Sequence, residues 1–324
     1  MPRWLAVVVL ALAFSAMVSG GCGPGRPAPG PEVFVCSEDS GVLLIDLDKV
    51  RVDPSARLWS WKVADSPEIP IGHRHYFSGH NECKPVMNGQ YVMVSSSWDG
   101  GVAIIRRADK KCVFYALGKG AHSLELIEGR FVATALSQEK GQIRLYDLGS
   151  DFPARPVLNA QPVWAIDSPW AHGVVWDYKR KVLYALGLDE VIRIRVNLAP
   201  AAPGTPATNP AIAEVLSRSK APDIGGHDLF PFDESHLSVT FHKGAWLYDV
   251  RTEQFSPLPG LNDRPDLKSV GRHPVTAQVM YTQARPGASS GREIKFLEAP
   301  DVPLPFKYLY KARWNLPNRF SYGP

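Results

Sequence analysis

The sequence predicts an all-β protein, a six-bladed β-propeller, and three observations lead to that prediction. Glycine and proline are abundant, at 27 and 29 of 324 residues, while 9 Trp, 11 Tyr and 13 Phe are spread along the chain. Such a composition is typical of short strands joined by turns. A pattern of strand, turn and strand also recurs along the chain, and its spacing matches that of propeller blades.

The repeat is clearest in two segments that align without a gap at an offset of 40 residues. Residues 83–94 and 123–134 each place two apolar runs around a turn that ends in Gly. The same pattern begins again at His172, His227 and Lys268. Three strands per unit, with a fourth usually readable, are typical of a propeller blade. The third strands are expected at 101–107, 141–148, 190–196, 244–250 and 292–299.

The first blade lacks an innermost strand of its own. Residues 33–39, 41–48 and 56–63 supply three of its strands, and residues 310–315 can supply the fourth. Closure by both ends of the chain leaves no open sheet edge. Successive innermost strands then begin at intervals of about 46 residues, which gives six blades. Seven blades are the alternative, if the Pro- and Ala-rich stretch 197–211 contains further strands.

The first 21 residues are typical of a secretory signal peptide. Arg3 precedes the apolar run 5–17, and small residues stand directly before Cys22. That run is too short to cross a bilayer, which takes about 20 apolar residues. The junction resembles that of a bacterial lipoprotein, so we expect lipidation at Cys22, with ordinary cleavage near the same point as the alternative. Residues 22–31 would then form a Pro/Gly tether, and 32–324 a single propeller domain.

This reading places the protein outside the cytoplasm, either secreted or held on a bacterial membrane by its lipid anchor. With Cys22 lipidated, three cysteines remain, which cannot all pair within one chain. We expect one disulfide and one buried thiol among Cys36, Cys83 and Cys112, with the pairing left open. A net charge of +4 without clusters argues against nucleic acid as a partner, and we expect a monomer.

Four segments resemble a family of secreted bacterial and fungal β-propellers that is filed as a domain of unknown function. The resemblance covers nearly the whole mature chain, and it implies the fold and an extracytoplasmic setting but no activity. The segments are VCSEDSGVLLIDLD, AHGVVWDYKRKVLYALG, DLKSVGRHP and YKARWN.

One ionisable residue begins each predicted innermost strand. Equivalent positions in six blades are related by rotations of about 60°, so we expect these side chains to converge at the mouth of the central channel, where propellers usually bind ligands. The alternative is structural, because histidines of the WD-repeat family form hydrogen bonds within their own blade. The six residues are Glu82, His122, His172, His227, Lys268 and Lys311.

These residue types favour metal and anion binding. Glu82 and the three histidines offer ligands to a divalent metal such as Mn, Fe or Zn. The two lysines would attract a carboxylate or a sulfate, and two nearby arginines could add bidentate contacts. The predicted anion-binding residues are Lys268, Lys311, Arg272 and Arg313.

The connection 65–81 carries further candidates for acid and base chemistry, Tyr76 and His80, and we expect it to cover the channel mouth. With His122, His172 and His227 these are the candidate catalytic residues. No Gly-rich phosphate loop, Gly-x-Ser-x-Gly elbow or His-Glu-x-x-His motif is present, so nucleotide-dependent enzymes, serine hydrolases of that type and zincins have no motif support.

The sequence therefore predicts a propeller enzyme that acts on an acidic, uronate-containing carbohydrate. The predicted site is similar in kind to that of propeller polysaccharide lyases, because abstraction of the proton beside a uronate carboxylate needs a cation and a base. A glycoside hydrolase is a second possibility, although the ring contains one acid. The competing class is a non-catalytic propeller that binds an acidic glycan or a partner protein.

Overall fold

The computed structural model describes residues 31–37, 41–199 and 211–323. The predicted signal peptide, Cys22 and all but the last residue of the predicted tether lie outside the described residues. Among the described residues, no helix is both long enough and apolar enough to span a membrane.

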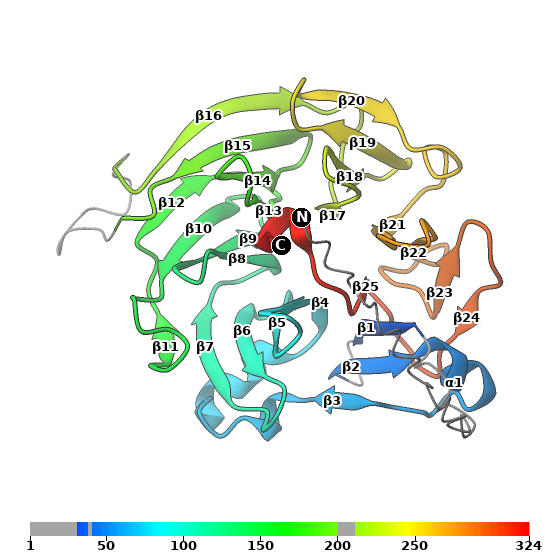
Figure 1. Ribbon diagram of the computed structural model, residues 1–324, viewed down its shortest axis with the longest axis horizontal. Coiled ribbons are helices and arrows are strands. Elements are labelled where there is room, and N and C mark those ends of the chain that lie inside the picture. The colour runs from blue at the N-terminus through cyan, green and yellow to red at the C-terminus, as the bar shows by residue number, and fades with distance from the viewer. Residues whose placement is uncertain (1–30, 38–40, 200–210, 324) are drawn as a thin grey trace, which may run out of the picture.

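Six small sheets surround a central axis (Figure 1), which confirms the all-β class and the six-bladed propeller. Neighbouring strands of each blade are antiparallel, apart from one added parallel strand in the second blade. In order from the axis outward, the first three blades are β25 (Ala312–Trp314), β1 (Glu32–Ser37), β2 (Gly41–Asp46) and β3 (Trp59–Trp61); β4 (His80–Val86), β5 (Tyr91–Ser96), β6 (Gly101–Arg106), β7 (Cys112–Leu117) and β11 (Val157–Ala160); and β8 (Ala121–Ile127), β9 (Phe131–Leu136), β10 (Gln142–Asp147) and β12 (Trp164–Asp167).

The other three blades each have four strands, with two short α-helices and two 3₁₀ helices in the connections and near the C-terminus. The blades are β13 (Gly173–Asp177), β14 (Val182–Leu186), β15 (Glu190–Val196) and β16 (Ala213–Lys220); β17 (Asp228–Pro231), β18 (His236–Thr240), β19 (Ala245–Asp249) and β20 (Gln254–Pro257); and β21 (Leu267–Arg272), β22 (Val279–Gln283), β23 (Glu293–Phe296) and β24 (Val302–Pro303). The helices are α1 (Leu47–Val52), η1 (Val63–Asp65), η2 (Ile71–Phe77) and α2 (Arg319–Tyr322).

Both ends of the chain build the first blade, as the sequence predicts. In the antiparallel pair of β25 and β1, Val33 lies opposite Trp314 and Val35 opposite Ala312. Two further backbone hydrogen bonds extend the pairing, since the Cys36 N–H donates to Lys311 at 3.0 Å and the Tyr310 N–H donates to Cys36 at 3.1 Å. β25 thereby pairs with the inner edge of β1 and closes the ring of sheets.

A disulfide joins the closing blade to its neighbour. Cys36 of β1 is bonded to Cys83 of β4, while Cys112 is a buried free thiol, so the expectation of one disulfide and one buried thiol is confirmed. The bond lies close to the pairing of the two chain ends. It therefore restrains the unfolded chain between residues 36 and 83, next to the strand pair that closes the ring.

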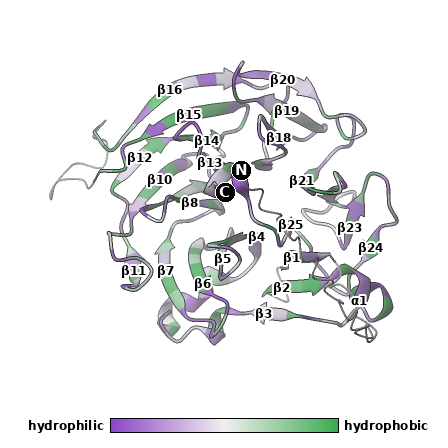
Figure 2. Cartoon of the chain, in the orientation of Figure 1, coloured by the Kyte–Doolittle hydropathy of each residue, from purple (hydrophilic) through white to green (hydrophobic). Residues whose placement is uncertain are grey.

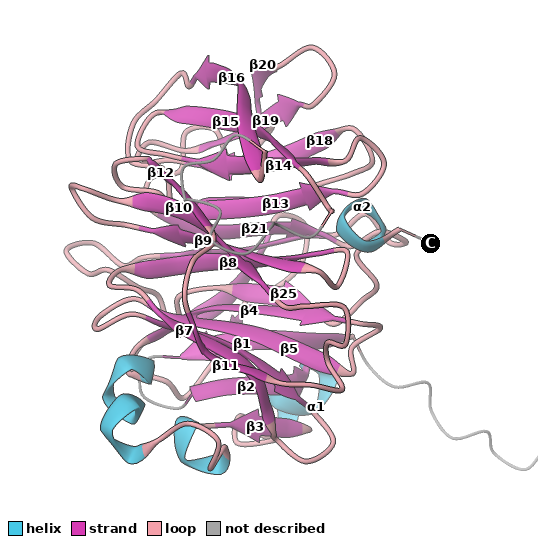
Figure 3. Ribbon diagram, turned by 90° about the vertical axis from the view of Figure 1, so that its left-hand side faces the viewer, coloured by secondary structure: helices cyan, strands magenta, loops and turns pink. Residues whose placement is uncertain are grey.

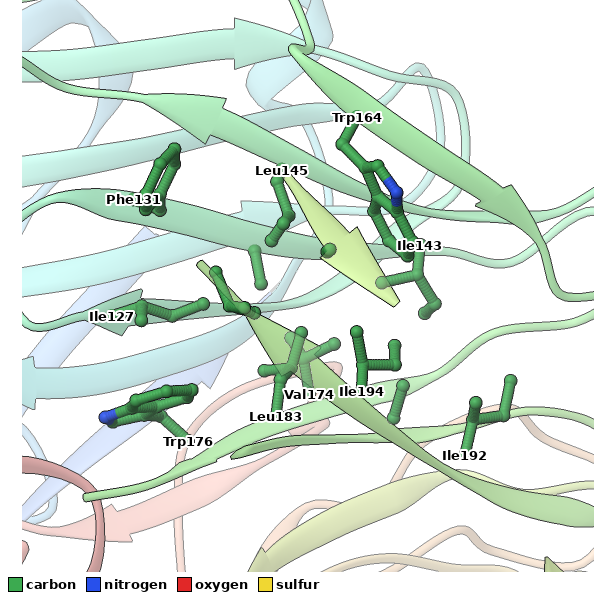
Figure 4. Packing of buried hydrophobic residues seen from close by; sticks show 14 of the residues in the cluster. Ile127, Phe131, Ile143, Leu145, Trp164, Val174, Trp176, Leu183, Ile192 and Ile194 are labelled. Atoms are coloured by element: carbon green, nitrogen blue, oxygen red, sulfur yellow. The ribbon is translucent and has the colours of Figure 1, made fainter. Parts of the chain in front are cut away.

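Hydrophobic side chains fill the spaces between blades. Between the third and fourth blades, Ile127 and Phe131 pack in one cluster with Val174 and Trp176, together with residues of β10 and β15 (Figure 4). Because both faces of a blade are covered, inner strands such as β5 are buried at every position. Figure 2 shows the same hydrophobic character along β2.

The two ends of the central channel differ. The C-terminal helix α2 lies at the centre of the ring in Figure 1 and beyond the strand ends in Figure 3. The Tyr178 N–H, in the turn after β13, donates to the Phe320 carbonyl at 2.9 Å. Helix α2 therefore covers the end at which the innermost strands finish. The opposite end, where they begin, is here called the channel mouth.

The connection 65–81 does not cover the channel mouth, contrary to the sequence-based expectation. Its 3₁₀ helix η2 packs on the second blade, where Tyr76 and Phe77 lie against Gly101 of the third strand, β6, and Phe77 also contacts Tyr115 of β7. Apolar contacts explain the difference, because Phe77 is buried in the cluster that also contains Trp61 and Tyr115.

Candidate functional site in the axial channel

The six residues that the sequence singled out all lie at or beside the starts of innermost strands, but their contacts divide them into two groups. The first group lies nearest the channel mouth, and we call it the mouth layer. It consists of His122, His172, His227 and Lys268. The second group lies one step deeper and contains Glu82 and Lys311.

The mouth layer is a chain of ring contacts that ends in a lysine. The ring centroids of His122 and His172 are 4.2 Å apart, and those of His172 and His227 are 5.5 Å apart. The Lys268 Nζ atom is 2.9 Å from the His227 Nε2 atom. Four successive blades, the third to the sixth, thus bring their first ionisable side chains together.

Two of these histidines also have the structural hydrogen bonds of the alternative hypothesis. The Nδ1 atom of His122 is 2.7 Å from the Gly120 carbonyl oxygen, and that of His172 is 2.9 Å from the Trp170 carbonyl oxygen. A carbonyl oxygen only accepts, so Nδ1 carries the hydrogen and Nε2 keeps a lone pair. The backbone bonds therefore orient both rings with Nε2 as a possible proton acceptor or metal ligand. At His172 the Ser137 hydroxyl lies 3.1 Å from Nδ1 and 3.4 Å from Nε2.

Burial keeps the mouth histidines neutral. Desolvation lowers the pKa of His122 to about 4, and it holds the pKa of His172 well below the ordinary value. Burial, together with the positive charge of Lys268, lowers the pKa of His227 to about 2. The pKa of Lys268 is itself lowered to about 8, mainly by burial and against the attraction of Asp266. Each neutral imidazole offers a lone pair to a proton or a metal, and its lowered pKa makes it a weaker base than a free histidine.

The next layer, which we call the ion-pair layer, consists of Glu82, Asp228, Lys311 and Arg313, each at most 1% exposed. The Arg313 guanidinium donates to both oxygens of Glu82, at 2.9 Å each, and to both oxygens of Asp228, at 2.8 and 2.6 Å. The Lys311 Nζ atom lies 2.9 Å from Asp228 and 3.3 Å from Glu82. Although burial favours the neutral acids, these cations hold the pKa values of both carboxyl groups below their ordinary range.

A third layer closes the far end of the channel. Lys84, two residues after Glu82 on β4, places its Nζ atom 3.1 Å from a Glu125 carboxylate oxygen and 2.8 Å from the Val174 carbonyl oxygen. The hydroxyl of Tyr322, from helix α2, donates to the other oxygen of Glu125. These two inner layers contain three carboxylates and three cations, so their charges balance internally.

The ion-pair layer changes the roles predicted for three residues. Lys311 and Arg313 bind carboxylates of the protein itself, so the geometry does not support a role in binding substrate. Glu82 has both oxygens in ion pairs with cations, which compete with a metal for the carboxylate. Its assignment as a metal ligand stays a prediction. Asp228, which directly follows His227, binds both Lys311 and Arg313. It was not among the six residues that the sequence singled out.

The other predicted residues lie away from the mouth layer. Arg272 ends β21, at the opposite end of the strand from Lys268, and its guanidinium lies 5.8 Å from the Phe232 ring centroid. His80 is buried, with Nδ1 2.9 Å from the Ser96 hydroxyl and its ring against Trp61. Tyr76 lies against its neighbour His75, with ring centroids 4.0 Å apart. Catalytic roles for Tyr76 and His80 and substrate binding by Arg272 stay predictions without support from this geometry.

One group of side chains at the mouth can hold a metal ion. His227, His242 and Asp266 each offer a ligand atom, and these atoms lie within 4.8 Å of one another. The Nδ1 atom of His227 is buried without a hydrogen-bond partner. His242 was missed from the sequence because it follows the second strand of its blade, β18, and so falls outside the innermost positions. The turn after β18 is nevertheless at the channel mouth, because β18 is antiparallel to β17.

Comparison with known proteins supports the fold and leaves the activity open. A model of a family of unknown function, DUF6528, matches residues 31–324, while no curated protein matches the chain. A solved protein of unknown function from Bacteroides caccae is 10% identical, with a TM-score of 0.54 over 87% of this chain and 98% of that one.

Two further solved structures are described as a "putative 6-phosphogluconolactonase". The protein from Bacteroides fragilis is 11% identical, with a TM-score of 0.54 over 85% of this chain and 79% of that one. The protein from Bacteroides uniformis is 10% identical, with a TM-score of 0.53 over 83% of this chain and 78% of that one. Identities this low show a shared fold alone. None of the three is described as a polysaccharide lyase, so that likeness rests only on the kind of site.

Proposed function

We propose that this chain, which belongs to the family of unknown function DUF6528, binds an acidic, uronate-containing carbohydrate at its channel mouth. One observation carries the proposal. The buried axial cations Lys84, Lys311 and Arg313 each lie within 3.3 Å of a carboxylate of the protein. The Lys268 Nζ atom, by contrast, is 4.0 Å from the nearer carboxylate oxygen of Asp266. Lys268 is therefore the axial cation best placed to take the carboxylate of a ligand.

The neighbouring imidazoles favour lyase chemistry on such a ligand. Lyase action requires a cation to neutralise the uronate carboxylate and a base to remove the proton beside it. Lys268 supplies the cation, and the Nε2 lone pairs of His122 and His172 supply candidate bases. A glycoside hydrolase has weaker support, because the acids of the ion-pair layer are engaged by cations. Non-catalytic binding of an acidic glycan or a partner protein is the competing function. For a glycan it predicts that substitution of Lys268 weakens binding, as the lyase does, but that the wild type shows no turnover.

A divalent metal would reinforce the same function. The ligand set His227, His242 and Asp266 is suited to Zn, Fe or Mn, and a bound ion would polarise the substrate carboxylate beside Lys268. Binding through the His227 Nε2 atom would require Lys268 to move away from that atom. Zn²⁺ titration of the metal-free protein tests this part. We expect a single site that His242→Ala removes. His236→Ala, at a half-buried histidine paired with Asp233, should leave the site unchanged.

The setting of this function is extracytoplasmic. The Cys36–Cys83 disulfide supports it, because such bonds persist in oxidising compartments. The signal peptide and lipid anchor predicted from the sequence point the same way. Outside the cytoplasm the protein would meet polymeric acidic glycans, which suits a site at the channel mouth.

The experiment uses oligosaccharides of galacturonate, alginate and hyaluronan as probes. Calorimetry with the full mature chain should show binding of at least one probe, and Lys268→Gln should weaken that binding at least about tenfold. The matched control is Lys220→Gln, at an exposed pair with Asp189, which should bind like the wild type. Absence of binding to every probe, or equal binding by the Lys268 variant, would contradict the proposal.

Turnover is measured separately. Lyase action produces unsaturated uronates, which absorb in the ultraviolet, and His122→Ala and His172→Ala should abolish that signal while probe binding persists. Binding by the wild type without any new absorbance or reducing ends would favour the non-catalytic function.

A further inference from the structure

Trp170 precedes His172 of the mouth layer by two residues, and its side chain is exposed. It is 44% exposed, and its carbonyl oxygen accepts the hydrogen bond from His172 Nδ1 at 2.9 Å. Trp170 is therefore two residues from His172 in the sequence, and its backbone is bonded to that imidazole. An exposed indole offers a flat apolar face with which a ligand ring can pack.

The backbone at Trp170 is also strained. Its φ angle is +55°, a left-handed conformation that is uncommon and strained for bulky residues. Three hydrogen bonds hold the segment in place. The Trp170 N–H donates to the Gln138 carbonyl at 2.8 Å, the Leu188 N–H donates to the Pro169 carbonyl at 3.2 Å, and His172 bonds the Trp170 carbonyl. These bonds thus fix the backbone of the loop at the expense of local strain.

We propose that Trp170 is a stacking platform for a sugar ring of the ligand whose carboxylate Lys268 binds. Pyranose rings present a face of C–H groups, which packs on the flat indole, while the ring hydroxyls stay in water. The occupant is a carbohydrate because an exposed aromatic residue stands at the same end of the channel as a cation and neutral imidazoles, and an acidic sugar combines the matching features. This inference rests on the proposed function and adds to it the contact that would recognise the sugar ring itself.

One variant distinguishes the effect of removing the Trp170 indole from the effect of destabilising the fold. Glycine adopts positive φ without steric cost, so Trp170→Gly removes the indole and relieves the backbone strain together. We expect the Trp170→Gly protein to melt at or near the temperature of the wild type. Trp170→Phe keeps an aromatic face and should retain part of the binding.

The test measures binding of galacturonate, alginate and hyaluronan oligosaccharides to the full mature chain by calorimetry. For the probe that the wild type binds, Trp170→Gly should lower the affinity at least about tenfold, with an intermediate loss for Trp170→Phe. The matched control is Tyr178→Leu, which removes an aromatic ring of similar exposure, 37%, at the α2 end of the channel. This control should bind like the wild type.

The outcomes separate the two proposals. If the wild type binds a probe, Lys268→Gln weakens binding and Trp170→Gly does not, the platform is wrong and the proposed function stands. If no probe binds, both are wrong. Loss of binding by Trp170→Gly together with a lowered melting temperature would also count against the platform, because it would assign the indole a structural role.

Discussion

Substitution of Arg313 by Ala should destabilise the propeller more than any exposed charge change, because Arg313 connects three blades. It belongs to β25 of the first blade, and it binds Glu82 of the second and Asp228 of the fifth through four hydrogen bonds of 2.6 to 2.9 Å. Loss of one partner from a buried ion pair costs about 3–5 kcal/mol. Because two carboxylates lose a partner and only Lys311 remains to compensate, we expect the free energy of unfolding to fall by about 4 kcal/mol or more.

Urea denaturation at equilibrium, with the disulfide intact, measures this change. A loss of that size is a large fraction of the typical total of about 5–15 kcal/mol, so the midpoint should fall sharply at an unchanged slope. Arg195→Ala is the control, since Arg195 is in an exposed pair with Glu214 at 2.8 Å and should cost less than about 1 kcal/mol. Arg313→Lys, which keeps the charge but loses the bidentate geometry, should show an intermediate loss.

A double-mutant cycle with Glu82→Gln tests whether the effect comes from the ion pair. Residues in one salt-bridge network couple by about 0.5–3 kcal/mol, and for this bidentate pair we expect a value near the upper end. A loss below about 1 kcal/mol for Arg313→Ala, or additive effects of the two substitutions, would refute the reasoning and show that the ion-pair layer contributes little to blade closure.

Three further predictions concern closure, pH and the anchor. Deletion of residues 305–324 removes β25 and α2, so the chain should unfold or aggregate; a soluble truncated protein with the melting temperature of the full chain would show that β25 is dispensable. Burial lowers the pKa of His80 to about 4, so the folded protein takes up fewer protons than the unfolded chain below pH 6.5, and stability falls as the pH falls toward 4. Between pH 7.5 and 5, the free energy of unfolding of His80→Asn should therefore fall by about 2 kcal/mol less than that of the wild type. Equal falls for the two proteins, measured by urea titration at both pH values, would contradict this. Cys22→Ser should move the protein from the membrane fraction to the soluble fraction; an unmodified N-terminus on soluble wild-type protein would exclude the anchor.

The repeated pattern of strand, turn and strand determined the architecture of this protein. Each unit buries both faces of its strands against neighbouring units, so the apolar runs and turns that specify a blade are local and can be recognised without the structure. The pairing of β25 with β1 could be inferred as well, because a ring that lacks one inner strand needs it from the other end of the chain. Equivalent positions in the repeat also identified the histidines and Lys268 as neighbours.

The tertiary structure decided which of these residues bind one another. Arg313 and Glu82 are 231 positions apart and Arg313 and Asp228 are 85 apart, and their contact depends on the depth of each residue along the axis. A shift of two residues along an inner strand moves a side chain to the next layer, as Glu82 and Lys84 of β4 show. An alignment of the repeats does not show how deep along the axis each side chain lies. It also does not identify His242, which follows the second strand of its blade. Hydrogen bonds between such groups act over about 3 Å, so only the folded ring could separate the self-neutralised ion pairs from the cation and imidazoles that remain for a ligand.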